Sequence, residues 1–139
     1  MKILLQCDGG SRGNPGPAAY GYVIFDITSG AVKILEKCGK YLGQTTNNQA
    51  EYAGLISALD WVVKHHPQAD LQIKMDSLLI VNQIKGQFKV KHPAIIPRYR
   101  QVKTLLAQLP PSSISYVPRA ENALADALVN EALDAHQAH

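Results

Sequence analysis

The stretch that decides the fold runs from residue 45 to residue 62 and reads TTNNQAEYAGLISALDWV. Its apolar residues recur at Leu55, Ala58, Leu59 and Val62, the spacing of a helical stripe that is buried against the rest of a protein. Glu51 lies one helical turn before Leu55 and therefore falls on the same stripe. A carboxylate on a face that should be buried needs an explanation.

Two explanations for Glu51 are open from this segment alone. Asn48 can be the N-cap of the helix with Glu51 as its partner in a capping box, and an acidic residue in the first turn also suits the helix dipole. Alternatively, Glu51 faces the interior because it binds something there. The rest of the chain has to decide between them.

The size and composition of the chain are those of a globular protein. Its 139 residues suggest a single domain spanning residues 1–139. No apolar run approaches the roughly 20 residues of a membrane span, and MKILLQCDGG lacks the apolar core of a signal peptide. We expect a cytoplasmic monomer without a membrane partner, and we expect Cys7 and Cys38 to be free thiols.

The basic residues are unevenly distributed. The formal net charge is only +3, but no acidic residue occurs between Asp76 and Glu121. That span holds seven of the 14 basic residues: Lys85, Lys89, Lys91, Arg98, Arg100, Lys103 and Arg119. It can be an ordinary solvated surface or a surface that meets phosphates.

The hydrophobic pattern predicts an α/β domain with the element order βββαβααβα. Strands are expected at residues 2–8, 20–27, 31–42, 71–75 and 113–117. Helices are expected from the opening stretch to just before Pro67, from a cap at Asp76–Ser77 to about Gln83, at 98–109, and from Asn122 onward. The Gly- and Pro-rich residues 9–21 read as a loop. This order predicts a mixed sheet, with a hairpin meander followed by parallel crossovers.

Four acidic residues lie where this topology can bring them together. Asp8 ends the first strand and Asp76 ends the fourth, and ligands bind at the carboxyl ends of such strands. Glu51 begins a helix that packs on the sheet, and Asp126 lies early in the last helix. Each acid alone can be a turn, cap or dipole residue.

Clustered carboxylates repel one another unless a cation neutralises them, and oxygen ligands suit Mg²⁺ or Mn²⁺. A two-metal site of this kind activates a water and stabilises the leaving oxygen in displacement at phosphorus. The sequence therefore predicts a metal-dependent phosphodiesterase, and the acid-free basic stretch fits a polyanionic substrate.

The motifs DGGSRGNPGPAAYG, TTNNQAE, MDS and ENALADALVNEAL, in this order and spacing, resemble type 1 ribonuclease H. The resemblance runs from about Lys2 to Ala135. It implies the ribonuclease H-like fold, a five-stranded mixed sheet flanked by helices. It also implies endonucleolytic hydrolysis of the RNA strand of RNA–DNA hybrids with two Mg²⁺ or Mn²⁺ ions, giving 5′-phosphate and 3′-hydroxyl ends. The catalytic, metal-binding carboxylates are then Asp8, Glu51, Asp76 and Asp126.

The resemblance also implies a set of substrate contacts: Gly9, Gly10, Asn14, Thr46, Asn47 and Gln49. The two glycines let a nucleic-acid backbone approach closely, and the amide side chains can donate and accept in a minor groove that displays 2′-hydroxyls. Thr46 resembles a residue that helps to hold a DNA phosphate. Helix capping remains open as an additional role of Thr46 and Asn47, and plain turn chemistry remains open for Asn14.

Two features depart from well-known members of the family. The region KGQFKVKHPAIIPRYR replaces an inserted basic arm and contains no tryptophan, and the loop VPRAENALAD lacks the histidine that many members carry there. Arg119 is the charged donor that can replace this histidine as an auxiliary catalytic residue, or it is a plain surface arginine. The pattern resembles shorter archaeal and bacterial enzymes, some of which also act on double-stranded RNA, so this substrate stays open.

Two alternative functions remain. One is a non-catalytic hybrid-binding module, which the four acids argue against because clustered negative charge repels phosphates. The other is a metal-dependent phosphatase or nuclease with a different substrate, which the NNQAE and NPGP motifs argue against.

Overall fold

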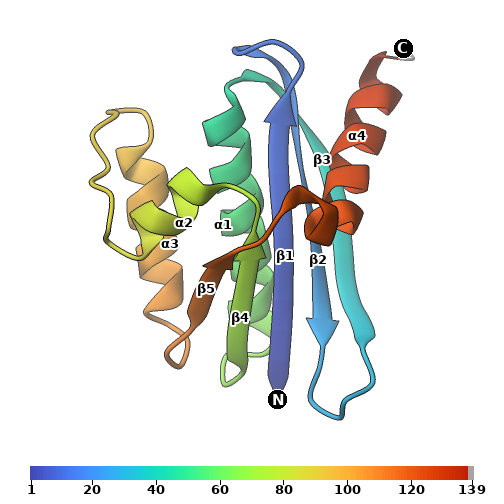
Figure 1. Cartoon of the computed structure of the whole chain (residues 1–139), viewed down its shortest axis with the longest axis vertical. Coiled ribbons are helices and arrows are strands. Elements are labelled where there is room, and N and C mark those ends of the chain that lie inside the picture. Colours follow the sequence, from blue (N-terminus) through green and yellow to red (C-terminus); the bar gives the residue numbers. More distant parts are fainter. Residues whose placement is uncertain (138–139) are drawn as a thin grey trace.

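The computed structural model describes residues 1–137. Its elements follow the order expected from the sequence, with one additional 3₁₀ helix before the last helix (Figure 1). They are β1 (Lys2–Ser11), β2 (Gly16–Asp26), β3 (Lys33–Thr45), α1 (Asn47–His65), β4 (Asp70–Met75), α2 (Leu78–Ile84), α3 (Ile96–Leu106), β5 (Ser113–Tyr116), η1 (Arg119–Asn122) and α4 (Ala123–Gln137).

The five strands form one mixed sheet in the order β3-β2-β1-β4-β5. β1, β2 and β3 pair antiparallel as a meander, whereas β4 and β5 each join in parallel. The predicted mixed sheet is therefore confirmed, including the adjacency of β1 and β4 on which the placement of the acids depends. Figure 1 shows α1 passing behind the sheet and α4 beside the upper ends of β2 and β3.

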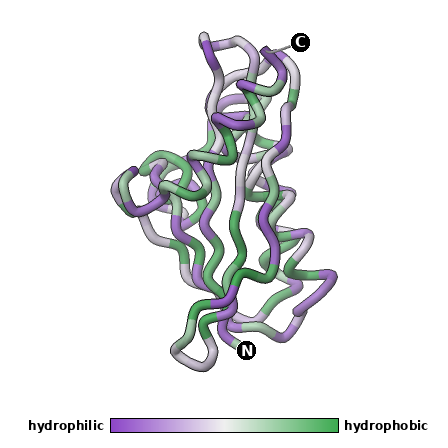
Figure 2. The backbone as a smooth tube through the Cα atoms, turned by 90° about the vertical axis from the view of Figure 1, so that its right-hand side faces the viewer, coloured by the Kyte–Doolittle hydropathy of each residue, from purple (hydrophilic) through white to green (hydrophobic). Residues whose placement is uncertain are grey.

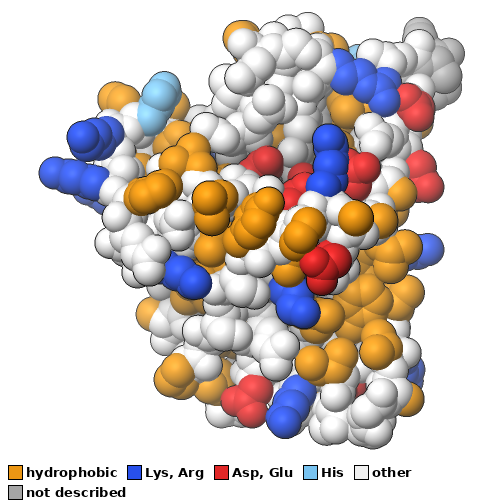
Figure 3. Space-filling view, viewed as in Figure 1, with side chains coloured by type: hydrophobic (Ala, Val, Ile, Leu, Met, Phe, Trp, Pro, Cys, Tyr) orange, Lys and Arg blue, Asp and Glu red, His pale blue; other side chains and the backbone are white. Residues whose placement is uncertain are grey.

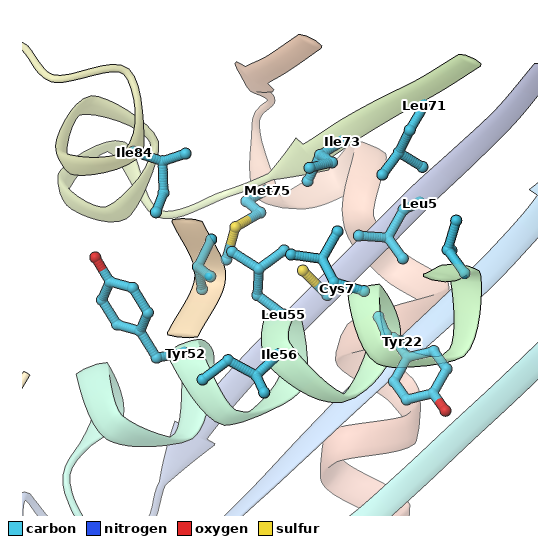
Figure 4. Packing of buried hydrophobic residues seen from close by; sticks show 14 of the residues in the cluster. Leu5, Cys7, Tyr22, Tyr52, Leu55, Ile56, Leu71, Ile73, Met75 and Ile84 are labelled. Atoms are coloured by element: carbon cyan, nitrogen blue, oxygen red, sulfur yellow. The ribbon is translucent and has the colours of Figure 1, made fainter. Parts of the chain in front are cut away.

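Alternation along the strands separates the two faces of the sheet. Ile3, Leu5 and Cys7 of β1 face α1 and belong to the main core, in which side chains of the sheet, α1, α2 and α3 are packed together (Figure 4). The opposite face receives α4, where Ala19, Val129 and Leu133 form a smaller buried cluster. In the side view of Figure 2, hydrophobic stretches run along the strands.

The loop expected over residues 9–21 exists but is confined to residues 12–15, because β1 continues to Ser11 and β2 already begins at Gly16. The paired strands here contain glycines where helices lie against the sheet. A Cβ on Gly9 would lie 2.4 Å from the backbone of α1, and a Cβ on Gly21 would lie 2.5 Å from the carbonyl oxygen of Ala125 in α4. These glycines are thus explained by close packing of helices on strands, not by turns.

Other element boundaries also differ from the prediction. Thr46, not Asn48, is the N-cap of α1, and its hydroxyl accepts a hydrogen bond of 3.2 Å from the amide of Gln49. Helix α3 begins at Ile96, with Pro97 inside its first turn, where the missing N–H of proline costs no hydrogen bond.

Cys7 and Cys38 are free, as expected, and Cys7 is buried. Over residues 1–137, none of the helices combines the length and hydropathy that a bilayer crossing requires.

Candidate active site

Asp8 and Asp76 come together because β1 and β4 run side by side. Their parallel pairing continues to Gln6 opposite Lys74, and each acid lies two residues beyond that pair. Asp76 directly follows the end of β4, as predicted. Asp8 was predicted to end the first strand, which is wrong because β1 continues to Ser11. The predicted proximity of the two acids does not depend on this difference, because it follows from the pairing of β1 with β4.

Glu51 lies near these two acids because α1 lies directly on β1. The absent side chain of Gly9 lets the backbone at Ala50 and Glu51 approach, since a Cβ there would stand 2.4 Å from the amide nitrogen of Glu51. With Thr46 as N-cap, no acidic residue lies in the first turn of α1. The alternative explanation of Glu51 as a capping partner is therefore wrong.

Asp126 lies in the first turns of α4, which packs on the other face of the sheet. Gly21 pairs with Asp8 on one side and with Gly39 on the other. A Cβ on Gly21 would lie 2.5 Å, and one on Gly39 2.7 Å, from carbonyl oxygens of α4. This row of glycines beside Asp8 lets α4 pack closely on the sheet, and Asp126 therefore lies near Asp8.

The four acids line one open cleft of about 550 Å³. Figure 3 shows acidic side chains gathered in a hollow near the upper centre of the molecule, with basic side chains around it. The cleft is lined by Asp8, Gly9, Gly10, Ser11, Arg12, Asn47, Asn48, Glu51, Asp76, Tyr116, Arg119, Asp126, Val129, Asn130 and Leu133.

Burial and mutual repulsion disfavour the ionised forms of two acids. Burial, followed by the charge of Asp76, raises the pKa of Asp8 to about 8, although the amide of Gly9 donates a hydrogen bond of 2.9 Å to its carboxylate. Burial, followed by Asp76, also raises the pKa of Glu51 to about 7, against the lowering effect of a hydrogen bond with Ser77. A bound cation would reverse both effects.

The donor set of the cleft fits a hard divalent cation. It consists of carboxylate oxygens, and Oε2 of Glu51 is buried without a hydrogen-bond partner among the described residues. Within residues 1–137, no three acidic, histidine or cysteine side chains already stand in a metal-binding arrangement.

Asn14 and Asn47 join the turn after β1 to the start of α1. Oδ1 of Asn14 accepts a hydrogen bond of 3.0 Å from the amide of Asn47. Oδ1 of Asn47 in turn accepts from the amide and the hydroxyl of Ser11, at 2.7 Å and 3.0 Å. Asn47 lines the cleft of the four acids, whereas Asn14 lies outside it.

Gln49 and Thr46 line a neighbouring pocket with Asn14 and are not among the residues that line the cleft of the four acids. The amide of Gln49 is used inside the protein. Its Oε1 accepts from Arg98 at 3.1 Å, and its Nε2 donates to the carbonyl of Ala94 at 3.0 Å. Gln49 thus ties α1 to the start of α3.

Arg119 stands at the mouth of the cleft. One of its guanidinium nitrogens is 3.2 Å from Oδ1 of Asp126, and its side chain is 78% exposed. It therefore contacts one of the four acids while most of its side chain is open to solvent.

Asn122 was missed by the sequence analysis. It is fully buried in η1, and its Nδ2 donates to the carbonyl of Cys7 at 2.9 Å and to Oδ1 of Asp76 at 3.2 Å. The only signal in the sequence was its position four residues before Asp126, which reads equally well as an ordinary helix start.

A mixed sheet with helices on both faces, and four acids beside the carboxyl ends of the paired strands β1 and β4, defines the class of ribonuclease H-like domains. The family model described as "Reverse transcriptase-like" matches residues 6–132. Among solved structures, LC11-RNase H1 in complex with an RNA/DNA hybrid superposes with a TM-score of 0.90 at 38% identity, over 98% of this chain and 99% of that one. The chain belongs to the type 1 ribonuclease H family.

Curated relatives agree with this assignment. Ribonuclease HI of Halobacterium salinarum is 42% identical over 96% of this chain and 65% of its own length. A bifunctional protein of Mycobacterium tuberculosis is 44% identical over 97% of this chain. The chain spans only 36% of the length of that relative.

Proposed function

We propose that this protein is an endoribonuclease that hydrolyses the RNA strand of RNA–DNA hybrids. The observation that carries the proposal is the convergence of Asp8, Glu51, Asp76 and Asp126 in one cleft. Membership of the ribonuclease H family supports it, as does a relative of 38% identity whose structure holds an RNA/DNA hybrid.

The four carboxylates are proposed to hold two Mg²⁺ ions, with Mn²⁺ as a substitute. When bound, such a pair supplies an activated water and a counter-charge for the leaving 3′ oxygen, so the products carry 5′-phosphate and 3′-hydroxyl ends. Asp8 is buried, and Oε2 of Glu51 is buried without a hydrogen-bond partner among the described residues, so a bound cation would neutralise two carboxylates that the protein alone leaves poorly solvated.

The hybrid is proposed to lie across the cleft, with its minor groove over the start of α1. Gly10, Asn47 and the backbone at Gly9 line the cleft and contact the RNA strand there, where 2′-hydroxyls are displayed. Asn14, Thr46 and Gln49 border the neighbouring pocket. Asn14 and Gln49 are proposed to contact the RNA strand or the minor groove from there, and Thr46 is proposed to help hold a DNA phosphate. In this arrangement Gln49 also holds the start of α3 in position.

Basic side chains beyond α2 are proposed to contact phosphates in place of the missing arm. Lys85, Lys89 and Lys91 are exposed, as is Arg100 of α3. Figure 3 shows basic side chains at the left edge of the face that carries the acidic hollow. Such contacts make binding salt-dependent without adding sequence preference.

The test is cleavage of an end-labelled RNA–DNA hybrid with Mg²⁺, Mn²⁺ or EDTA, alongside duplex RNA, duplex DNA and a small phosphoester. We expect metal-dependent cutting of the RNA strand only, with 3′-hydroxyl ends. Binding of the hybrid without any cutting would instead identify a binding module. Products with 2′,3′-cyclic phosphate would overturn the proposed chemistry, and cutting of duplex RNA would extend the substrate range.

Arg119 is proposed to be an auxiliary catalytic residue in place of the family's loop histidine. Replacing Arg119 by Ala is expected to lower kcat about tenfold, which corresponds to about 1.4 kcal/mol, because the cleft loses its guanidinium donor beside Asp126. Arg119→Lys should retain part of the activity because it keeps the charge. Single-turnover and steady-state rates on the hybrid measure the effect, and an unchanged kcat for Arg119→Ala would show that Arg119 is a surface residue.

A further inference from the structure

The side chain of Asn122 joins three segments that carry the proposed catalytic acids. It lies in η1, directly before α4 with Asp126, and none of it is exposed. Its Nδ2 contacts the carbonyl of Cys7, the residue before Asp8, and also Oδ1 of Asp76. One amide group thus links β1, the end of β4 and the start of α4.

The orientation of the Asn122 amide is determined by its partners. Both groups within reach of Nδ2 are acceptors, so a flipped amide would place an oxygen against a carbonyl and a carboxylate. Oδ1 of Asn122 is buried without a hydrogen-bond partner among the described residues. The fold thus tolerates an unpaired buried oxygen to retain two donated hydrogen bonds.

We propose that Asn122 is a positioning residue for the Asp76 carboxylate, an inference that rests on the proposed nuclease function. A neutral N–H donor orients one oxygen of Asp76 and eases its repulsion with Asp8 and Glu51, yet does not compete for the site as a cationic side chain would. Its second bond, to the Cys7 carbonyl, sets the position of Asp76 relative to β1.

The chain offers a control in Asn82. It lies on α2, is partly buried and does not line the cleft of the four acids. Its replacement by alanine removes the same amide group outside the site, whereas the enclosed surroundings of Asn122 leave no water to replace the bonds that its partners lose.

The experiment compares Asn122→Ala, Asn122→Ser and Asn82→Ala with the unchanged protein. The readouts are the rate of hybrid cleavage as a function of Mg²⁺ concentration, KM for the hybrid, and the rise in Tm that Mg²⁺ causes without substrate. For Asn122→Ala we expect kcat to fall about 10- to 100-fold, a several-fold higher Mg²⁺ requirement, a smaller Mg²⁺-induced rise in Tm and an unchanged KM. Asn122→Ser should lie in between because a hydroxyl donates one bond. Asn82→Ala should stay within about threefold of the unchanged protein in every readout, because it lies outside the cleft.

Each contrary outcome has a distinct meaning. A lower Tm in EDTA together with normal kcat and normal Mg²⁺ dependence would show a purely structural role for Asn122 and overturn the inference. Unfolding of both Asn122 variants at the assay temperature would overturn it in the same way. If the unchanged protein does not cut the hybrid, the proposed function fails, but a weaker Mg²⁺ effect on the Tm of Asn122→Ala would still support positioning of Asp76.

Discussion

Replacing Asp8 by Asn is expected to reduce cleavage of the RNA strand at least about 10³-fold while leaving binding of the hybrid largely intact. Asp8 is the central acid of the cleft, because the charges of Asp76, Glu51 and Asp126 all act on it. Asparagine keeps the shape and an oxygen that can still accept the 2.9 Å hydrogen bond from the amide of Gly9, but it removes the charge that a divalent cation requires.

Single-turnover cleavage of an end-labelled hybrid measures the rate, and fluorescence anisotropy in EDTA measures binding. Asp60→Asn is the matched control, because Asp60 lies on α1 in an exposed ion pair with Lys64, outside the cleft. Cleavage by Asp8→Asn at a rate close to that of the unchanged protein would refute the assignment of the catalytic site.

The stability of the same variant shows whether a lost activity reflects misfolding. The pKa of Asp8 is raised in the folded protein to about 8, so the folded state binds its proton more tightly than the unfolded chain does. The stability due to this proton is complete below about pH 4 and is lost as pH rises through about 8.

In EDTA at pH 8 to 9, Asp8→Asn is therefore expected to have a Tm roughly 3–5 °C above that of the unchanged protein, as about 1 kcal/mol would produce. Mg²⁺ should narrow or reverse this difference, since it stabilises only the intact site. Thermal unfolding with and without Mg²⁺ measures both effects, and a lower Tm for the variant in EDTA would contradict the argument.

Replacing Gly9 by Ala is expected to destabilise the protein by about 3 kcal/mol or more and to abolish most cleavage. The added Cβ would lie 2.4 Å from the backbone of Ala50 and Glu51, so either α1 or β1 must shift. Because Glu51 is carried by that turn of α1, the shift moves a proposed metal ligand as well. Urea unfolding and cleavage assays on the same sample measure the two consequences.

Gly10→Ala is the matched control for this prediction. Among the described residues, a Cβ on Gly10 would meet only side-chain atoms of Asn47 and Val129, both at 3.9 Å, which is ordinary contact. We expect its stability to stay within about 1 kcal/mol of the unchanged protein. Equal stability of Gly9→Ala and Gly10→Ala would show that the approach of α1 does not depend on Gly9, whereas weaker hybrid binding by Gly10→Ala alone would support a substrate contact at that position.

Much of the fold could be read from local patterns. The stripe from Leu55 to Val62 predicts α1, and alternation in β1 and β4 predicts which side chains face the core, because helical and strand periodicity are properties of neighbouring residues. The same patterns predicted Asp76 at the end of its strand and Asp8 on the neighbouring strand, so two of the four acids could be brought together before any packing was known. The end of β1 was placed three residues too early, because the strand continues to Ser11.

The glycines of residues 9–21 show where prediction from local composition failed. Residues 9–21 resemble a loop in composition, yet Gly9 and Gly21 lie in paired strands because helices on opposite faces of the sheet need the space of a missing side chain. Composition cannot distinguish a glycine needed for a turn from one needed for close packing, since the packing partner is far away in the sequence.

The sequence by itself determined the order of the strands and α-helices, the mixed sheet and the convergence of the four acids. The elements follow from hydrophobic periodicity, and the convergence of the acids follows from their places in the topology and from a specific set of motifs. Only the tertiary structure decided that Thr46 caps α1, that Gln49 is bonded to Ala94 and Arg98, and that Asn122 bridges Cys7 and Asp76. The physical reason is the same in each case: a hydrogen-bonding side chain has several possible partners along its own segment, and which one it takes depends on what the fold places within about 3 Å of it.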